Sequence, residues 1–312
     1  MFIAQAFKYY HDFWRYLIGS LIVIIASFIG QIPFMIAVFA ELGLKKLQSG
    51  GVSEKQMMTT LEPNLNLFLL LLSFVFAMAG IVLVIKFLHK QPFKKLTTSR
   101  KKVDWKRILF SFTLMAIFVV ASTYYDYYTN PESYVINFKP VPFAILCVIA
   151  VIMVPIQTSV EEYIFRGYLM QGFGTLAKNR WFPLLLTSLI FGGLHFFNPE
   201  VTKLGNIVMI YYIGTGLFLG IITLMDEGME LALGFHAANN LIAALLVTAD
   251  WTVFQTESIL KDISEPSTGL QVVLPVFIIF PIFLIIFAKV YKWKNWKDKL
   301  TGEIKEPQPI SE

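Results

Sequence analysis

Long apolar blocks alternate with short polar stretches along most of the chain. An α-helix needs about 20 apolar residues to cross the hydrocarbon core of a bilayer, and the blocks have about this length. The pattern therefore predicts an all-α fold, a polytopic transmembrane helical bundle of about eight spans. The expected spans cover residues 14–39, 65–88, 108–124, 142 onward through the 160s, 182–197, 207–225, 229–247 and 270–288.

Positive charge gathers in three stretches between or after these spans. Residues 86–107 form the most basic loop, Lys178 and Arg180 form a second group, and the tail 289–299 is again rich in lysine. Cytoplasmic loops carry an excess of Lys and Arg, so eight spans with both termini cytoplasmic place all three groups on the same side. Lys45, Lys46 and Lys55 fall on the opposite side in this arrangement and do not follow the rule.

Composition narrows the class of protein. Only 15% of the 312 residues are charged, against about 25% in soluble proteins. The net charge is +5, and the basic residues lie beside the apolar blocks. This position indicates contact with membrane lipid and no nucleic acid partner. The single cysteine, Cys147, lies in an apolar block, which excludes an intrachain disulfide and a cysteine metal site and suggests a small core residue. We expect an integral protein of the bacterial inner (cytoplasmic) membrane.

The spans suggest four consecutive regions. Residues 1–140 hold three N-terminal membrane helices and the basic loop 86–107, and residues 141–250 form the helical core that carries the candidate chemistry. Residues 251–300 add a C-terminal span and a basic tail, and the Pro-containing residues 301–312 are expected to be disordered. The aromatic-rich residues 1–13 are expected to form a helix lying at the membrane interface.

Two adjacent carboxylates, Glu161 and Glu162, follow the apolar segment 143–156. Ionised groups at membrane depth cost about 2.5–3.5 kcal/mol each on insertion scales, so they indicate function. On a helix, Glu162 and Arg166 are four residues apart and can pair, whereas Glu161 is turned about 100° away. One acid can thus be held by a cation while the other stays available as a general base. The pair Glu162–Arg166 could equally be purely structural.

Three further polar residues lie within later apolar spans. His195 lies about 13 residues into the fifth span, and His236 and Asn240 lie four residues apart on one face of the seventh. A single His or Asn in a membrane helix can simply bond to a neighbouring helix. Their occurrence together with Glu161 favours convergence on one interior pocket. Because His195 lies deep in its span, this convergence requires the fourth helix to continue to about Phe173.

The patterns Glu161-Glu162-x-x-x-Arg166, Phe191-x-x-x-His195 and His236-x-x-x-Asn240 resemble the three motifs of the CPBP intramembrane protease family. That family includes the type II CAAX prenyl endopeptidases and bacterial bacteriocin-processing and self-immunity (Abi) proteins. The resemblance covers about a third of the chain. It implies an eight-helix intramembrane endopeptidase that cleaves a peptide or small-protein substrate.

By this resemblance Glu161 would activate a water molecule, His195 and His236 would orient that water or hold a metal, and Asn240 with His236 would stabilise the oxyanion. Glu162 and Arg166 would support the helix of the base. Glu161, His195 and His236 could supply three ligands to Zn²⁺, but the His-Glu-x-x-His spacing is absent, and a metal-free mechanism stays open. The alternatives are a non-catalytic membrane scaffold and a proton-relaying transporter. The transporter is disfavoured because the chain shows no related halves.

Overall fold

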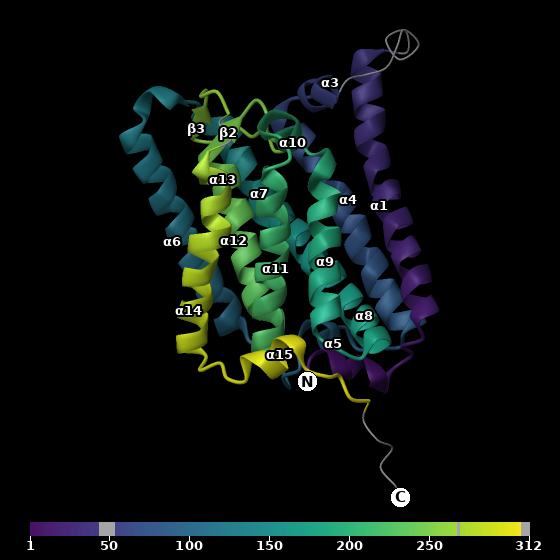
Figure 1. The fold of residues 1–312 in the computed structure, drawn as a ribbon. Helices are drawn as coiled ribbons and strands as arrows, with labels where there is room; N and C mark the ends of the chain where they lie inside the picture. Colours follow the sequence, from purple (N-terminus) through teal and green to yellow (C-terminus); the bar gives the residue numbers. More distant parts are fainter. Residues whose placement is uncertain (44–53, 267–268, 307–312) are drawn as a thin grey trace, which may run out of the picture.

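The computed structural model describes residues 1–43, 54–266 and 269–306 as a bundle of helices with a small sheet at one end (Figure 1). Apolar helices occur at each of the eight positions predicted from the sequence. Six are long enough to cross a membrane and two are shorter. The six are α1 (Phe13–Leu42), α4 (Pro63–Leu83) with a π-helical extension to Leu88, α6 (Trp105–Thr129), α7 (Pro140–Glu162) with its continuation, α11 (Val208–Asp226) and the last span Val272–Val290; the two are α9 (Trp181–Leu194) and α12 (Glu230–Leu246).

Shorter elements join these helices. The last span is built from α13 (Leu270–Leu274), a π-helical turn (Pro275–Ile279) and α14 (Phe280–Val290). The connecting elements are the 3-10 turns Ile3–Lys8, Pro131–Ser133 and His195–Phe197, with the short helices α3 (Glu54–Thr59), α5 (Phe93–Thr97), α10 (Pro199–Leu204) and α15 (Trp296–Thr301).

The fourth helix continues well beyond Arg166, as predicted. After α7, a π-helical segment (Tyr163–Leu169) leads without a break into α8 (Met170–Ala177). A π-helical turn bonds i to i+5 and is frequent at functional sites inside α-helices. This one directly follows Glu161 and Glu162, so the irregular turn of the helix lies at the candidate site.

Close helix crossings depend on glycine. A side chain at Gly216 of α11 would meet the backbone of Ser188 in α9, and one at Gly234 of α12 would meet the carbonyl of Ile108 in α6. The glycines that follow Arg166 serve the same purpose, because Gly172 packs on the ring of Tyr16. The space beside these glycines is therefore filled by neighbouring side chains and leaves no room for water.

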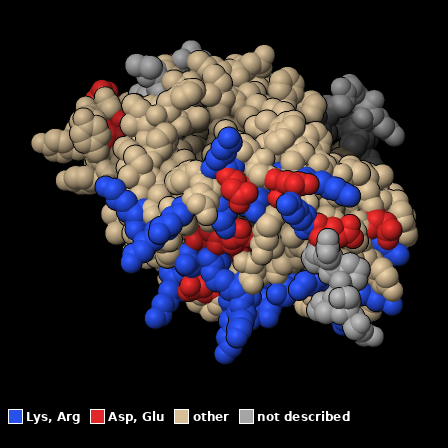
Figure 2. All heavy atoms as spheres, turned by 60° about the horizontal axis from the view of Figure 1, so that its bottom comes forward, with Lys and Arg blue, Asp and Glu red and all other residues tan. Residues whose placement is uncertain are grey.

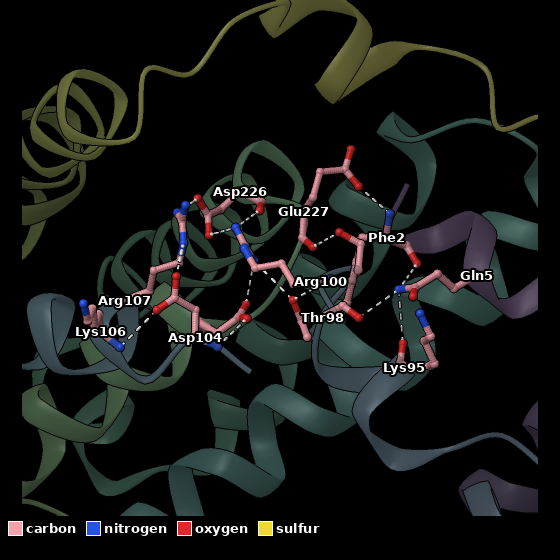
Figure 3. Close-up of polar contacts among 12 residues, drawn as sticks. Phe2, Gln5, Lys95, Thr98, Arg100, Asp104, Lys106, Arg107, Asp226 and Glu227 are labelled. Atoms are coloured by element: carbon pink, nitrogen blue, oxygen red, sulfur yellow. Dashed lines mark hydrogen bonds and ion pairs between the residues drawn. The ribbon is translucent and has the colours of Figure 1, made fainter. Parts of the chain in front are cut away.

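One end of the bundle is strongly basic and holds the start of the chain together with α15 (Figures 1 and 2). Figure 3 shows the polar contacts at this end. Arg100 and Arg107 both bind the buried carboxylate of Asp226, with Arg100 Nη2 at 2.7 Å. The neighbouring Glu227 accepts hydrogen bonds from the backbone of Phe2 and from Lys299. Its contacts tie both ends of the described chain to the turn after α11.

Two expectations about the chain ends are wrong. Residues 1–13 do not form an interfacial helix. Ile3 begins a short 3-10 turn, Phe2 precedes it, and both side chains are buried against Met170. Order also extends past residue 301, because Ile304 is buried and its N–H donates to the carbonyl of Lys178 at 2.8 Å. Residues 307–312 lie outside the described part, as do Lys45 and Lys46.

The opposite end carries a small sheet formed by segments that lie mostly between the predicted spans. The strand order is β1 (Tyr134–Ile136), β3 (Leu260–Asp262), β2 (Val247–Ala249). β3 pairs antiparallel with β1 and parallel with β2. The sheet therefore joins the loop before α7 to the segment after α12, at the end away from the basic face (Figure 1).

Candidate active site

The two adjacent glutamates point to different partners. Glu162 is fully buried, and its Oε1 accepts a hydrogen bond from Nη1 of Arg166 at 2.8 Å, which confirms the predicted pair. Glu161 is partly accessible, and its Oε1 accepts a hydrogen bond from Nε2 of Gln157. Glu161 thus keeps its second oxygen, Oε2, toward His236.

Arg166 is compensated on three sides. Besides Glu162, its Nη2 donates to the carbonyl of Gly216 at 3.2 Å, and its guanidinium lies 4.3 Å above the centre of the Phe191 ring. A buried ion pair needs partners for its remaining donors and acceptors. These contacts supply them for Arg166, whereas Oε2 of Glu162 is buried without a hydrogen-bond partner in the described part of the chain. The ion pair locks the π-helical segment to α9 and α11.

His236 lies between the two acids. Its Nδ1 contacts Glu162 Oε1 at 2.8 Å, and its Nε2 lies 3.5 Å from Glu161 Oε2. The Glu162 carboxylate can only accept hydrogen bonds, so the ring nitrogen of His236 that faces it must be a donor. In the neutral imidazole the proton therefore lies on Nδ1. Nε2 is then a free acceptor that faces Glu161. The buried acid thereby sets the tautomer that the accessible acid meets.

A chain of side-chain amides ends on the same carboxylate. Asn239 Nδ2 donates to Asn240 Oδ1 at 2.9 Å, and Asn240 Nδ2 donates to Gln157 Oε1 at 3.3 Å. Gln157 Nε2 in turn donates to Glu161 Oε1 and completes the chain of hydrogen bonds. Asn240 Nδ2 also lies 3.5 Å from His236 Nε2. The sequence analysis did not select Gln157 or Asn239. The position of Gln157 one helical turn before Glu161 is the signal that could have found it.

His195 lies at the end of α9 and is held from two sides. Its Nδ1 contacts the carbonyl of Phe191 at 2.7 Å, and its ring stacks on Tyr212 with centroids 4.5 Å apart. The Phe191 ring packs against both imidazoles, at 4.8 Å from His195 and 6.2 Å from His236. Within the described part of the chain, His195 makes no direct polar contact with Glu161 or His236.

All four candidate residues line one cavity of about 870 Å³. Glu161 and Gln157 enter it from α7, His195 from the end of α9, and His236 and Asn240 from α12. Apolar side chains such as Ile164, Leu194 and Phe254 form most of its remaining wall. The cavity is large enough to hold water and a short length of polypeptide next to Glu161.

Two of the three candidate metal ligands lie close together. Glu161 and His236 are close enough to share one ion, because ligands at about 2.0–2.2 Å around a tetrahedral zinc lie about 3.5 Å apart. His195 does not join them: in the described residues no group of three or more His, Cys, Asp or Glu side chains is arranged to hold a metal. No step of the reaction proposed below is assigned to a metal.

Fold and site together define a helical membrane protein with an acid–imidazole–amide cluster facing an internal cavity. Residues 140–242 match the family described as type II CAAX prenyl endopeptidase Rce1-like. The chain is also 32% identical over 242 residues to the uncharacterized protein YyaK of Bacillus subtilis (strain 168), an alignment that covers 77% of this chain and 80% of the relative.

The chain belongs to the CPBP intramembrane protease family. It is accordingly an integral membrane protease of the CAAX type that acts on a peptide or protein substrate.

Proposed function

We propose that this protein is an endopeptidase in which Glu161 is the general base. The observation that carries the proposal is the position of its free oxygen, 3.5 Å from the Nε2 acceptor of His236 and open to the cavity. A water molecule bound there could donate one hydrogen to Glu161 and the other to an imidazole. Both hydrogens would then be engaged, leaving an oxygen lone pair for attack on a peptide carbonyl.

The reaction proceeds through a tetrahedral intermediate. The water oxygen bonds to the carbonyl carbon while its proton moves to Glu161, and Asn240 Nδ2 donates a hydrogen bond to the developing oxyanion. The C–N bond then breaks, and Glu161 returns the proton to the leaving amine. His195, fixed by Phe191 and Tyr212, holds the water from the opposite wall. Glu162 and Arg166 position His236 and touch no reacting atom.

The orientation of the bundle follows from its charge. The basic face that carries the chain start and α15 is cytoplasmic in this proposal, in accord with the distribution of Lys and Arg in membrane proteins (Figure 2). The membrane is the bacterial inner membrane. The cavity lies among the membrane helices, so substrates are membrane-associated polypeptides, with or without a prenyl group.

The test compares purified wild type with Glu161→Gln in detergent. The probes are internally quenched decapeptides, with and without a farnesylated cysteine near the C-terminus. Removing the general base is expected to lower kcat/KM by about 10²- to 10⁴-fold. The matched control is Glu132→Gln, an exposed acid in the turn before β1, which is expected to cleave like wild type. Cleavage by Glu161→Gln within threefold of wild type contradicts the assignment.

The same preparations separate an enzyme from a scaffold. A scaffold predicts no cleavage by wild type and a host phenotype that Glu161→Ala supports as well as wild type at equal membrane levels. The protease predicts that activity and phenotype are lost together.

A further inference from the structure

The first membrane helix carries an ordered set of polar side chains that the site described above does not use. Between Leu17 and Ala40 the polar side chains are Ser20, Ser27 and Gln31, and all the others in that stretch are apolar or glycine. At 100° per residue these three fall within an arc of about 40° on one face of α1. Such alignment indicates that one face of the helix meets a polar environment.

That environment is the catalytic cavity. Ser20, Ser27 and Gln31 all line it, on a wall distant in sequence from Glu161. Phe28, the neighbour of Ser27, points outward and is 69% exposed. The family match begins at residue 140, so α1 contributes to the cavity from outside the matched region.

These side chains differ from several other hydroxyl residues of the bundle. Ser73, Thr187 and Ser188 each donate to a carbonyl of their own helix at 2.7–2.8 Å, the usual way in which a hydroxyl is satisfied inside a membrane helix. The side chains of Ser20, Ser27 and Gln31 form no hydrogen bond within the described part of the structure. They present unused donors and acceptors to the cavity.

We propose that this face of α1 is the docking wall for the backbone of the substrate, a proposal that rests on the endopeptidase function above. A polypeptide must be extended to present a scissile bond to Glu161, and an extended chain within the bilayer carries unpaired N–H and C=O groups. Ser20, Ser27 and Gln31 pair with these groups on one side of the chain. Glu161, His236 and Asn240 act on its other side.

The spacing of the wall fits an extended chain. Ser27 and Gln31 are about 6 Å apart along the helix axis, close to the roughly 6.6–6.8 Å repeat of backbone groups on one side of a strand. From Ser20 to Gln31 the wall is about 16 Å long, which spans about five extended residues. Because backbone groups are common to all sequences, this wall sets the path of the substrate and leaves side-chain preference to the apolar lining.

Thiol labelling tests the wall without relying on cleavage. Ser27→Cys and Phe28→Cys are made in a Cys147→Ser background and treated, in membranes, with a charged methanethiosulfonate, which reacts with the thiolate and so requires water. Ser27→Cys is expected to react at least tenfold faster than Phe28→Cys. The unprenylated decapeptide should slow labelling of Ser27→Cys several-fold. Equal labelling of the two positions, or no protection by the peptide, overturns the proposal.

Kinetics tests the role of the wall in binding. In Ser27→Ala and Gln31→Leu, each lost hydrogen bond is expected to raise KM about 2- to 10-fold while kcat changes little. Phe28→Leu is the control and should behave like wild type. An unchanged KM, or a loss confined to kcat, contradicts docking on α1. If Glu161→Gln stays active, the base assignment fails but the labelling result still decides the role of α1.

Discussion

At the residue scale, one peptide bond separates two acids with different environments. Glu162 is buried and bound by both Arg166 and His236, whereas Glu161 faces the cavity with one oxygen free. Side chains at adjacent positions of a helix point about 100° apart, so two neighbouring residues can contact different parts of the surrounding structure. The inner acid orients the imidazole and the outer acid meets its acceptor nitrogen.

This division predicts that Arg166 and Glu161 differ in their effect on stability. Arg166→Met leaves Glu162 as an uncompensated buried charge and is expected to cost about 3–5 kcal/mol. Glu161→Gln removes no ion pair with Arg or Lys and should leave the thermal midpoint close to that of wild type. Thermal unfolding in detergent, followed by tryptophan fluorescence, measures both. Equal midpoints for the two variants would show that the buried pair does not hold the π-helical segment.

At the element scale, glycine positions determine where helices cross. A Cβ at Gly234 would lie 2.1 Å from the carbonyl oxygen of Ile108, a backbone atom that cannot rotate away. The crossing of α6 and α12 fixes the start of the helix that carries His236 and Asn240. The crossing therefore sets the position of two site residues.

Gly234→Ala is accordingly expected to be destabilising, by about 1–3 kcal/mol or more, because the two backbones must separate. The matched control is Gly193→Ala: a Cβ there meets no atom within 4 Å, so helix propensity alone should leave stability unchanged or raise it by about 0.5–1 kcal/mol. Thermal midpoints in the same detergent check both. A tolerated Gly234→Ala would mean that α6 and α12 are not in close contact.

At the scale of the whole molecule, the N-terminal segment is held to the bundle by His89, just after the end of the second span. Its Nδ1 donates to the carbonyl of Tyr10 at 2.6 Å, and its Nε2 lies 3.0 Å from the hydroxyl of Tyr168, which itself donates to the carbonyl of Arg15. Burial, with a smaller contribution from the charge of Arg15, lowers the pKa of His89 below its ordinary value.

This pKa shift makes the free energy of unfolding depend on pH. Below pH 6.5, the ordinary pKa of histidine, the unfolded chain takes up a proton that the folded His89 resists. Its contribution to stability is therefore complete above pH 6.5 and is lost as the pH falls toward the folded pKa. The thermal midpoint of wild type should drop between pH 7.5 and 5.5, and the drop should be smaller in His89→Gln. An equal drop in both proteins would assign the pH dependence to other groups.

Most of the helical layout could be predicted from the sequence. Apolar length places each helix, and i,i+4 spacing pairs Glu162 with Arg166, because both depend on residues close together in the chain. The helix through residue 173 followed from the depth of His195. The chain-end predictions failed for a different reason: Phe2 and Ile304 are ordered by partners far away in sequence.

By itself, the sequence determined that this is a multi-span membrane protein and which acid, imidazole and amide groups lie inside its apolar helices. Only the tertiary structure decided that Gln157 binds Glu161, that His195 lies apart from the other two, and that α1 closes the cavity. The physical reason is the distance along the sequence over which each effect acts. Hydropathy and helical periodicity act within a segment, whereas the partner of a buried polar group is chosen by how distant helices pack.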